Sequence, residues 1–138
     1  MPELPPTPLF VYGTLIFGEV IDRVIGRRPL DVRRAAAPSW SARVIPGATY
    51  PGLVPDQLSA AGGLLLGDLS AAELAALDEY EGAEYVRAPI EVVDDRGKVV
   101  AAQTYLVDPA LVGDEVWTSR WFFDEHLEAF LAMLDAER

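Results

Sequence analysis

Alternating hydrophobic and polar positions divide the first half of the chain into short extended segments. The run LFVYGTL, from Leu9 to Leu15, is apolar and rich in β-favouring residues, so it predicts a buried strand that ends in a turn. Residues Trp40 to Ile45 alternate and predict a second strand, and the turn residues of the following PGATYPGLVPD predict an ordered loop. A third strand is predicted from Gly63 to Leu69.

Helical periodicity appears near both ends of the chain. Glu19 to Ile25 places its valines and isoleucines on one stripe, and Gly26 follows in the position of a helix stop. From Asp124 onward, apolar residues recur at helical spacing and predict a C-terminal helix; they are Leu127, Phe130, Leu131 and Leu134.

The middle of the chain gives the clearest signals. A helix is predicted over residues 71–80, because Ser70 and Glu73 have the spacing of a capping box. The segments Tyr85 to Val93 and Lys98 to Val107 flank DDRG, which is typical of a hairpin turn, and predict two antiparallel strands. A doubly wound parallel sheet fits this order poorly. The predicted fold class is α+β, a small mixed β-barrel with a few flanking helices.

Length and composition indicate one folded domain. The chain has 138 residues, 51% of them hydrophobic, which is enough to bury a core at this size. Residues 1–8 hold four prolines and no apolar run, so they predict a disordered tail before a single domain over 9–138, and not a secretory signal. No stretch approaches the roughly 18 apolar residues of a membrane-spanning helix, so we expect a soluble, cytoplasmic protein without a membrane partner.

Charge and cysteine content narrow the function further. The net charge of −11 repels phosphate backbones, so nucleic acid is not an expected partner. The absence of cysteine excludes disulfides, thiolate nucleophiles and sulfur-based zinc sites. The acidic DEYEGAE lacks the alternating oxygen ligands and central glycine of a calcium loop, so we expect no metal. An alanine-rich surface is compatible with a homodimer, which the periodicity does not require.

Glu81 is the strongest candidate for a catalytic residue. At about 100° per residue, Leu74, Leu77 and Glu81 fall within one arc of the predicted helix, so the carboxylate projects from the core face at the helix end. Burial and the negative end of the helix dipole would both raise its pKa toward the range of a general base. The alternative is a last-turn glutamate that bends out to water, and periodicity alone does not decide between the two.

Other acidic residues near this helix end are weaker candidates for a catalytic role. Asp78 lies three residues before Glu81 on the flank of the same arc, so a coupled carboxylate pair is conceivable. The alternative for Asp78 is solvation or pairing with an arginine. Glu79 and Glu84 are expected to be surface charges.

A second candidate site is the loop YGTLIFG, from Tyr12 to Gly18. Backbone N–H groups at a junction between a strand and a helix can hold a carboxylate, and Gly13 lacks the side chain that would block close approach. The alternatives are that Gly13 is only a turn residue and that Tyr12 is a packing residue.

Other residues do not form a recognisable catalytic set. His126 is the only histidine, and no serine or cysteine motif surrounds it. Neither GxSxG nor a P-loop pattern occurs, so hydrolase and nucleotide sites have no support. The aromatic residues Trp117, Trp121, Phe122 and Phe123 are expected in the core, with the wall of a binding cleft as the alternative.

Two motifs together resemble the gamma-glutamylcyclotransferase-like (AIG2-like) family. LFVYGTLIFG contains the family's YG(S/T)L loop as Tyr12 to Leu15, and AxxYLVDP from Ala102 to Pro109 is similar to its closing strand. LDEYEGAEYVRAPIEV contains an LDxFE-type helix end followed by YxR, here Leu77, Asp78, Tyr80, Glu81, Tyr85 and Arg87. The resemblance covers most of the chain. This sequence has Tyr80 where phenylalanine is frequent.

The resemblance implies a small β-barrel with a few helices that releases 5-oxoproline from a small gamma-glutamyl substrate without a cofactor. Glu81 is then the general base, which takes a proton from the substrate's α-amino group and returns it to the leaving amine after attack on the γ-carbonyl. The residues Tyr12, Gly13, Thr14 and Leu15 correspond to the glutamyl-binding loop. Tyr85 is a further substrate-binding residue by the same resemblance.

Other functions stay open at the level of sequence. A non-catalytic binding or interaction module on the same fold is one alternative, since a fold can outlive its chemistry. An enzyme that removes a gamma-glutamyl tag is another. The leaving amine, expected as part of a gamma-glutamylamine or a gamma-glutamyl peptide, would be contacted by Pro46 to Leu58 and by the region Trp117 to Phe123.

Overall fold

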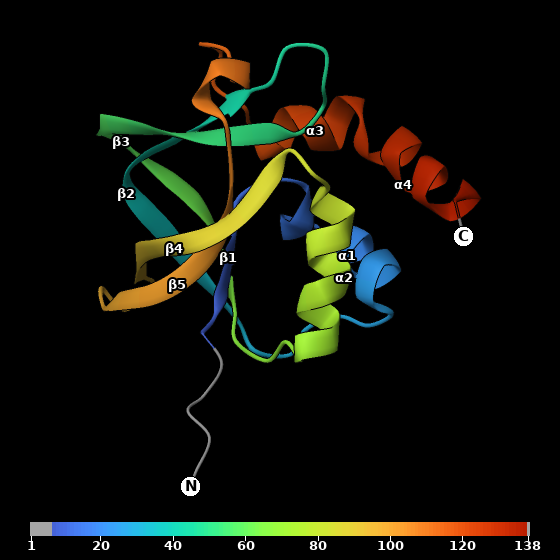
Figure 1. Ribbon diagram of the computed structural model, residues 1–138, viewed down its shortest axis with the longest axis horizontal. Helices are drawn as coiled ribbons and strands as arrows, with labels where there is room; N and C mark the ends of the chain where they lie inside the picture. The colour runs from blue at the N-terminus through green and yellow to red at the C-terminus, as the bar shows by residue number, and fades with distance from the viewer. Residues whose placement is uncertain (1–6, 138) are drawn as a thin grey trace, which may run out of the picture.

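Five strands close into a barrel in the computed structural model, which describes residues 7–137. They are β1 (Leu9–Val11), β2 (Val32–Val44), β3 (Pro51–Leu66), β4 (Tyr85–Asp94) and β5 (Val99–Val107). Around the barrel the order is β1-β3-β2-β4-β5, with β1 parallel to β5 and the other neighbours antiparallel. This confirms the predicted small mixed β-barrel (Figure 1).

Helices flank one side of the barrel. They are α1 (Gly18–Ile25), α2 (Ala71–Glu81), α3 (Ser119–Glu125) and α4 (Leu127–Ala136), with short 3-10 turns η1 (Thr14–Ile16) and η2 (Pro109–Leu111). Both α1 and α2 lie beside β1, and α4 extends away from the barrel toward the C-terminus (Figure 1). Within residues 7–137 no helix has the length and apolar character needed to span a membrane.

The strand β1 separates two hydrophobic cores. Leu9 and Val11 pack into the core between the barrel and the helices, whereas Phe10 and Tyr12 pack inside the barrel. Because successive side chains of a strand face opposite sides, a strand buried on both faces needs the continuous apolar run that the sequence shows. The loop that follows β1 therefore leaves from the centre of the molecule.

The clearest predictions from the sequence are confirmed. The N-cap Ser70 side chain accepts a hydrogen bond from the Glu73 N–H at 3.1 Å, and Glu73 accepts one from the Ser70 N–H at 3.0 Å, as a capping box requires. Gly26 ends α1 with a φ of 81°, which glycine adopts readily. The predicted hairpin is formed by β4 and β5.

The strands β2 and β3 pair as one hairpin, and both are longer than the predicted strands Trp40 to Ile45 and Gly63 to Leu69. The segment predicted as a loop from residue 46 to 56 is strand from Pro51 onward, because Val44 to Trp40 pair with Pro51 to Pro55. The first half of β2 was not predicted, since alanine favours strands weakly. There Ala35 and Ala37 are buried, and their small side chains fit the interior of a narrow barrel.

Other boundaries also differ from the sequence prediction. The C-terminal helix predicted from Asp124 onward corresponds to α4. A further helix that was not predicted, α3, precedes it, and the two meet at His126, where the backbone φ is −131°. Of the predicted disordered tail, residues 1–6 lie outside the described residues. Pro8 is tied to the barrel, because its carbonyl accepts a hydrogen bond from the Gln103 N–H at 2.9 Å.

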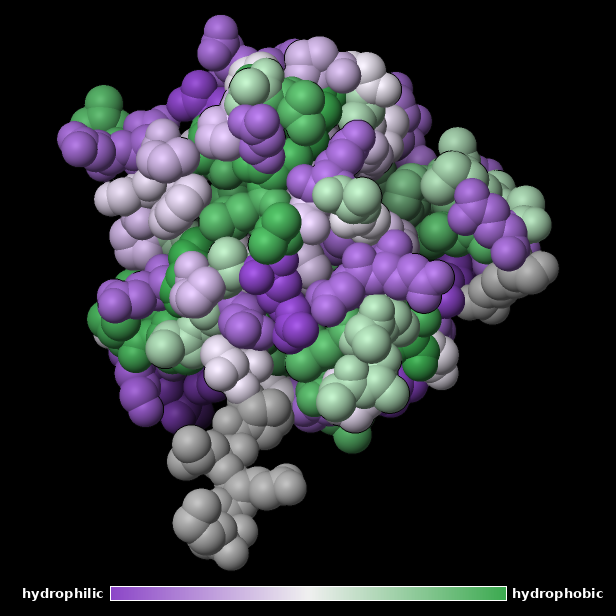
Figure 2. Space-filling model, in the orientation of Figure 1, coloured by the Kyte–Doolittle hydropathy of each residue, from purple (hydrophilic) through white to green (hydrophobic). Residues whose placement is uncertain are grey.

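Hydrophilic and hydrophobic residues are interspersed on the visible surface (Figure 2). A pale hydrophobic area covers the start of α2, where Ala71, Ala72 and Ala75 are exposed. This is the alanine-rich exterior that the composition suggests.

Candidate active site

Glu81 is the last residue of α2, and its side chain turns toward the interior. Leu77, one turn earlier, is fully buried, and Glu81 lies partly buried in a pocket beside it. Burial raises the pKa of the Glu81 carboxyl from 4.5 to about 7. Periodicity left open whether Glu81 faces the core or bends out to water. In the structure its carboxylate lies in the pocket.

The predicted loop residues lie around the same carboxylate. Tyr12, Gly13, Thr14 and Leu15 line a narrow pocket that also contains Glu81 and Tyr85. The loop follows the end of β1 and lies beside the end of α2, although about 65 residues separate the loop from Glu81 in the chain. The structure thus brings together Glu81, Tyr85 and the loop from Tyr12 to Leu15, which are the residues that the sequence predicts for the site.

Hydrogen bonds brace the pocket wall. The Tyr12 hydroxyl donates to the Tyr105 carbonyl at 2.6 Å, and the Tyr85 hydroxyl donates to the Pro51 carbonyl at 2.7 Å. Burial raises the pKa of both tyrosines, so both hydroxyls stay protonated at neutral pH. These two bonds fix the rings against the backbone of other strands.

A further hydrogen bond joins the loop to α2. The hydroxyls of Thr14 and Tyr80 lie 2.8 Å apart, and burial raises the pKa of Tyr80. A phenylalanine at position 80 could not make this contact. Tyr80 therefore does more than fill space, because it ties the loop to the helix that carries Glu81.

Close packing explains why the loop contains Gly13. A Cβ at this position would lie 2.9 Å from the Cδ of Pro51, closer than real Cβ atoms approach. The N–H groups of Thr14 and Leu15 have no backbone acceptor within residues 7–137, as expected at the start of a helical turn. Two residues that line the pocket thus have backbone donors that no described backbone group accepts.

Sequence reasoning gave part of the wall only as a segment and missed Tyr105. Tyr50, Pro51 and Tyr105 also line the pocket. Tyr50 and Pro51 belong to the segment Pro46 to Leu58, which was expected at the rim. Tyr105 follows from the AxxYLVDP stretch only once the pairing of β1 with β5 is known.

The second expected rim segment lies elsewhere. No residue from Trp117 to Phe123 lines a cavity that contains Glu81. Trp117 and Phe122 are buried in the helix-side core, and the Trp117 indole N–H donates to the Thr49 carbonyl at 2.8 Å. Trp117 thus supports the rim, whereas Trp121 and Phe123 are exposed, so the expectation that they lie in the core was wrong.

Asp78 is held by a hydrogen bond and an ion pair within the fold. Its carboxylate accepts a hydrogen bond from the Tyr105 hydroxyl at 2.6 Å and lies 3.2 Å from the Arg87 Nε. It is therefore paired with an arginine, one of the two alternatives left by the sequence, and it holds α2 against β4 and β5. Glu79 and Glu84 are exposed, as expected.

The pocket is narrow as it stands. Its cavity volume is about 20 Å³, and a buried water needs about 10–15 Å³ by this kind of measure. A larger ligand must displace part of the wall. Tyr50 is the wall residue best placed to move, because it lies in the turn between β2 and β3 and is 36% exposed.

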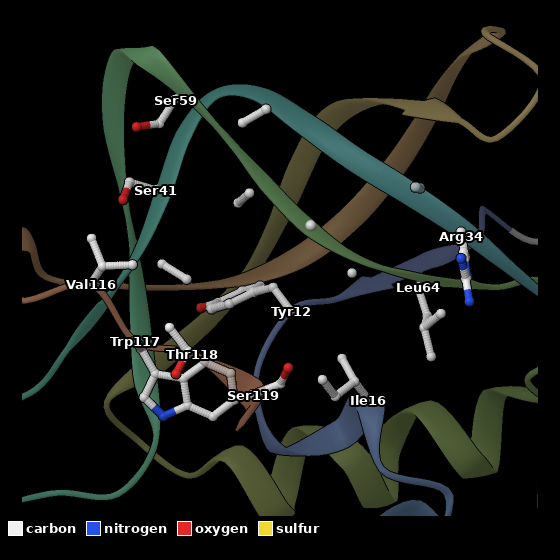
Figure 3. Close-up of a pocket in the computed structure, with 16 residues that line it drawn as sticks. Tyr12, Ile16, Arg34, Ser41, Ser59, Leu64, Val116, Trp117, Thr118 and Ser119 are labelled. Carbon is white, nitrogen blue, oxygen red and sulfur yellow. The ribbon is translucent and has the colours of Figure 1, made fainter. Parts of the chain in front are cut away.

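A larger cavity lies elsewhere in the molecule. It measures about 830 Å³ and lies between the bent hairpin of β2 and β3 and the segment Val116 to Ser119 (Figure 3). Arg34 lies at one end of it and Trp117 at the other (Figure 3). Its lining has many small residues and no carboxylate, so it offers no base, and Tyr12 is the residue it shares with the pocket of Glu81.

Comparison with known proteins places the chain among AIG2-like proteins. The family model for gamma-glutamyl cyclotransferase, AIG2-like, matches residues 9–122. AIG2-like protein D of Arabidopsis thaliana is 31% identical over 135 residues, which cover 91% of this chain and 84% of the relative. AIG2-like protein C of the same plant is 33% identical over 122 residues, covering 85% of this chain and 67% of the relative.

Solved structures agree with this placement. The solution structure of an Arabidopsis thaliana protein superposes with a TM-score of 0.71 at 27% identity, covering 96% of this chain and 90% of that one. A structure described as a gamma-glutamyl cyclotransferase superposes with a TM-score of 0.63 at 16% identity, covering 94% and 86% of the two chains, which shows the common fold. The chain belongs to the AIG2-like gamma-glutamyl cyclotransferase family.

Proposed function

We propose that this protein is a gamma-glutamyl cyclotransferase, which releases 5-oxoproline and a free amine from a gamma-glutamylamine or a gamma-glutamyl peptide. The observation that carries the proposal is the buried Glu81 carboxylate, with its pKa raised to about 7, in a pocket lined by the Tyr12 to Leu15 loop. A general base is most effective when its pKa lies near the working pH. Membership of the family supports the same reaction class.

In the proposed mechanism, one carboxylate serves both proton transfers. Glu81 takes a proton from the α-amino group of the substrate as that nitrogen attacks the γ-carbonyl carbon of the same molecule. A new carbon–nitrogen bond closes the five-membered ring. When the original amide bond breaks, Glu81 returns the proton to the leaving nitrogen, so the carboxylate ends in the state in which it began.

Positioning supplies much of the rate advantage in this scheme. Because the attack is intramolecular, holding the glutamyl unit in a folded conformation brings the reacting atoms together without a second molecule. The N–H groups of Thr14 and Leu15 lack other backbone acceptors and are suited to bind oxygen atoms of the glutamyl unit. The rigid attachment of this loop to Tyr80 favours such preorganisation.

The test is 5-oxoproline release by the purified protein from gamma-glutamyl alkylamines, gamma-glutamyl amino acids and glutathione. Wild type is compared with Glu81→Gln, which keeps the size of the side chain and removes the base. Glu84→Gln is the matched control, because Glu84 is exposed and lines neither cavity that contains Glu81. Release should be lost in Glu81→Gln and retained in Glu84→Gln.

Circular dichroism and thermal unfolding establish that both variants are folded. Full turnover in a folded Glu81→Gln variant would rule out the mechanism. If wild type binds gamma-glutamyl compounds but releases 5-oxoproline from none of them, the protein is a binding module on this fold and not an enzyme.

A further inference from the structure

The wall of the barrel has a gap beside the end of β1. This strand is three residues long and pairs with β3 only at Leu64 to Leu66. The preceding residues of β3, Ala60 to Gly63, pair with β2 on one side. On the other side they have no partner strand in the part of the chain that the structure describes. They therefore form a free strand edge, along which every second residue directs its N–H and C=O toward the open side.

This edge opens into the cavity of about 830 Å³ between the hairpin of β2 and β3 and the segment Val116 to Ser119, which we call the edge groove (Figure 3). Consecutive residues from Ser59 to Leu64 line it. Because neighbouring side chains of a strand point to opposite faces, such an unbroken run means that the groove follows the strand edge and not one face. At about 3.3 Å per residue the run extends for about 17 Å, the length of roughly five residues of extended peptide.

Small side chains leave the backbone of this edge accessible. Ala60, Ala61, Gly62 and Gly63 carry neither a charge nor a proline ring, the features that normally keep strand edges from pairing. A Cβ at Gly62 would meet no atom within 4 Å, so space is open beside the main chain. The segment Val116 to Ser119 forms the opposite wall of the groove (Figure 3). A single extended chain fits such a slot, whereas the sheet of a second folded molecule does not.

Arg34 is the only charged residue that lines the edge groove among residues 7–137. It is exposed, and no described residue forms an ion pair with it. Because Arg34 is the β2 partner of Leu64, it stands at one end of the groove and attracts a carboxylate there (Figure 3). The other polar side chains, such as those of Thr118 and Ser119, lie away from Arg34 (Figure 3). Polar groups in a small-molecule site converge, so this spread favours an elongated ligand.

We propose that the edge groove binds an extended peptide segment of another protein. The segment adds to Ala60 to Gly63 as an antiparallel strand, and main-chain hydrogen bonds supply most of its affinity. An antiparallel strand begins at the end of this edge where Leu64 lies, so an acidic residue at the start of the segment lies beside Arg34. This binding does not depend on the proposed reaction, because Glu81 does not line the groove.

The test uses the capped hexapeptide acetyl-Glu-Val-Thr-Val-Thr-Val-amide, whose β-branched residues favour an extended conformation. Titration into ¹⁵N-labelled protein should shift the NMR signals of the Ala60 to Gly63 amides, with a dissociation constant below about 1 mM. Because only every second N–H of an added strand faces β3, N-methylation distinguishes strand addition from other binding. Methyl groups on either the valine or the threonine nitrogens should weaken binding at least about tenfold, and those on the other set by less than about threefold.

Two results would overturn the proposal. One is that the signals of Ala60 to Gly63 do not shift at millimolar peptide. The other is that the two methylated peptides bind equally well, because the main chain of the peptide would then not pair with β3 as a strand.

Variants of the protein locate the bound peptide. Gly62→Leu fills the groove and should weaken binding at least about tenfold, while the free space at this position lets the fold accept the side chain. Arg34→Gln removes the cation and should weaken binding by about threefold. Arg96→Gln is the matched control, because Arg96 is exposed and lies outside the groove, and it should bind as wild type does. Circular dichroism and thermal unfolding establish that the variants are folded. Equal affinity of wild type, Gly62→Leu and Arg34→Gln would place the peptide elsewhere and overturn the proposal.

Discussion

The two ends of α2 each carry a glutamate, and the two carboxylates lie in opposite environments. At the start of the helix, Glu73 accepts hydrogen bonds from Arg27 at 2.7 and 2.8 Å and from the Ser70 N–H at 3.0 Å. The Arg27 hydrogen bonds, helped by that of Ser70, lower the Glu73 pKa to about 2. At the end of the helix, no described residue donates a hydrogen bond to Glu81, and burial raises its pKa to about 7.

The difference separates a carboxylate suited to holding the structure together from one suited to proton transfer. A carboxylate with cationic and backbone donors is stabilised in its charged form, and it fixes the chain around it. A carboxylate that is buried without donors costs folding free energy in its charged form, and it accepts a proton near neutral pH. Perturbed carboxylates of the second kind are concentrated at functional sites.

The largest expected effect is on catalysis. We expect Glu81→Gln to lower kcat/KM for 5-oxoproline release by about 10³-fold, within the range that general acid–base groups contribute. Glu73→Gln removes a carboxylate from the same helix and should leave kcat/KM within about twofold of wild type. Steady-state assays of both folded variants test this prediction. Equal losses of kcat/KM in the two variants would contradict a special role for Glu81.

The second effect is on the pH dependence of activity. Glu81 must be deprotonated to act as a base, so kcat/KM should fall as the pH drops below about 7. Well below that pKa the loss should approach about tenfold per pH unit, until the fold itself is lost. A pH profile of kcat/KM on the preferred substrate measures it. A profile that stays flat down to about pH 5 would mean that Glu81 has an ordinary carboxylate pKa.

The third effect is on stability at Glu81. Because its pKa is raised from 4.5 to about 7 on folding, the folded protein keeps a proton that the unfolded chain releases between those pH values. This group's contribution to stability is therefore complete below about pH 4.5 and is lost as the pH rises through about 7. Glu81→Gln should raise the free energy of unfolding at pH 8 by up to about 3 kcal/mol, and by little at low pH. Urea unfolding at both pH values tests this sign.

The smallest effect is on stability at Glu73, with the opposite sign. Its lowered pKa makes its contribution complete above the unfolded-state pKa of 4.5, and that contribution is lost as the pH falls toward about 2. Glu73→Gln should therefore lower the free energy of unfolding at pH 7 by about 1 kcal/mol, the usual value of a helix cap. Glu84→Gln is the control for loss of a surface charge. A Glu73→Gln variant as stable as wild type would show that Arg27 does not need the carboxylate.

Local features of the fold were predictable from the sequence. The capping box at Ser70, the stop at Gly26 and the hairpin of β4 and β5 each depend on residues that are close together in the chain. The first half of β2 was not predictable, because its alanines become strand residues only when they pack inside a narrow barrel. The break between α3 and α4 at His126 gave no recognisable signal in the sequence.

For the candidate site, the sequence by itself determined which residues are proposed to carry the chemistry: Glu81 at the end of its helix and the loop from Tyr12 to Leu15. Only the tertiary structure decided their environment. The pKa of a carboxyl depends on its surroundings, and Glu81 shares its pocket with Tyr50, Pro51 and Tyr105, which come from distant parts of the chain. Phe130, Met133 and Leu134 of α4 line a second cavity that contains Glu81. Helical periodicity predicts that these residues share an apolar face, but it does not predict what that face contacts.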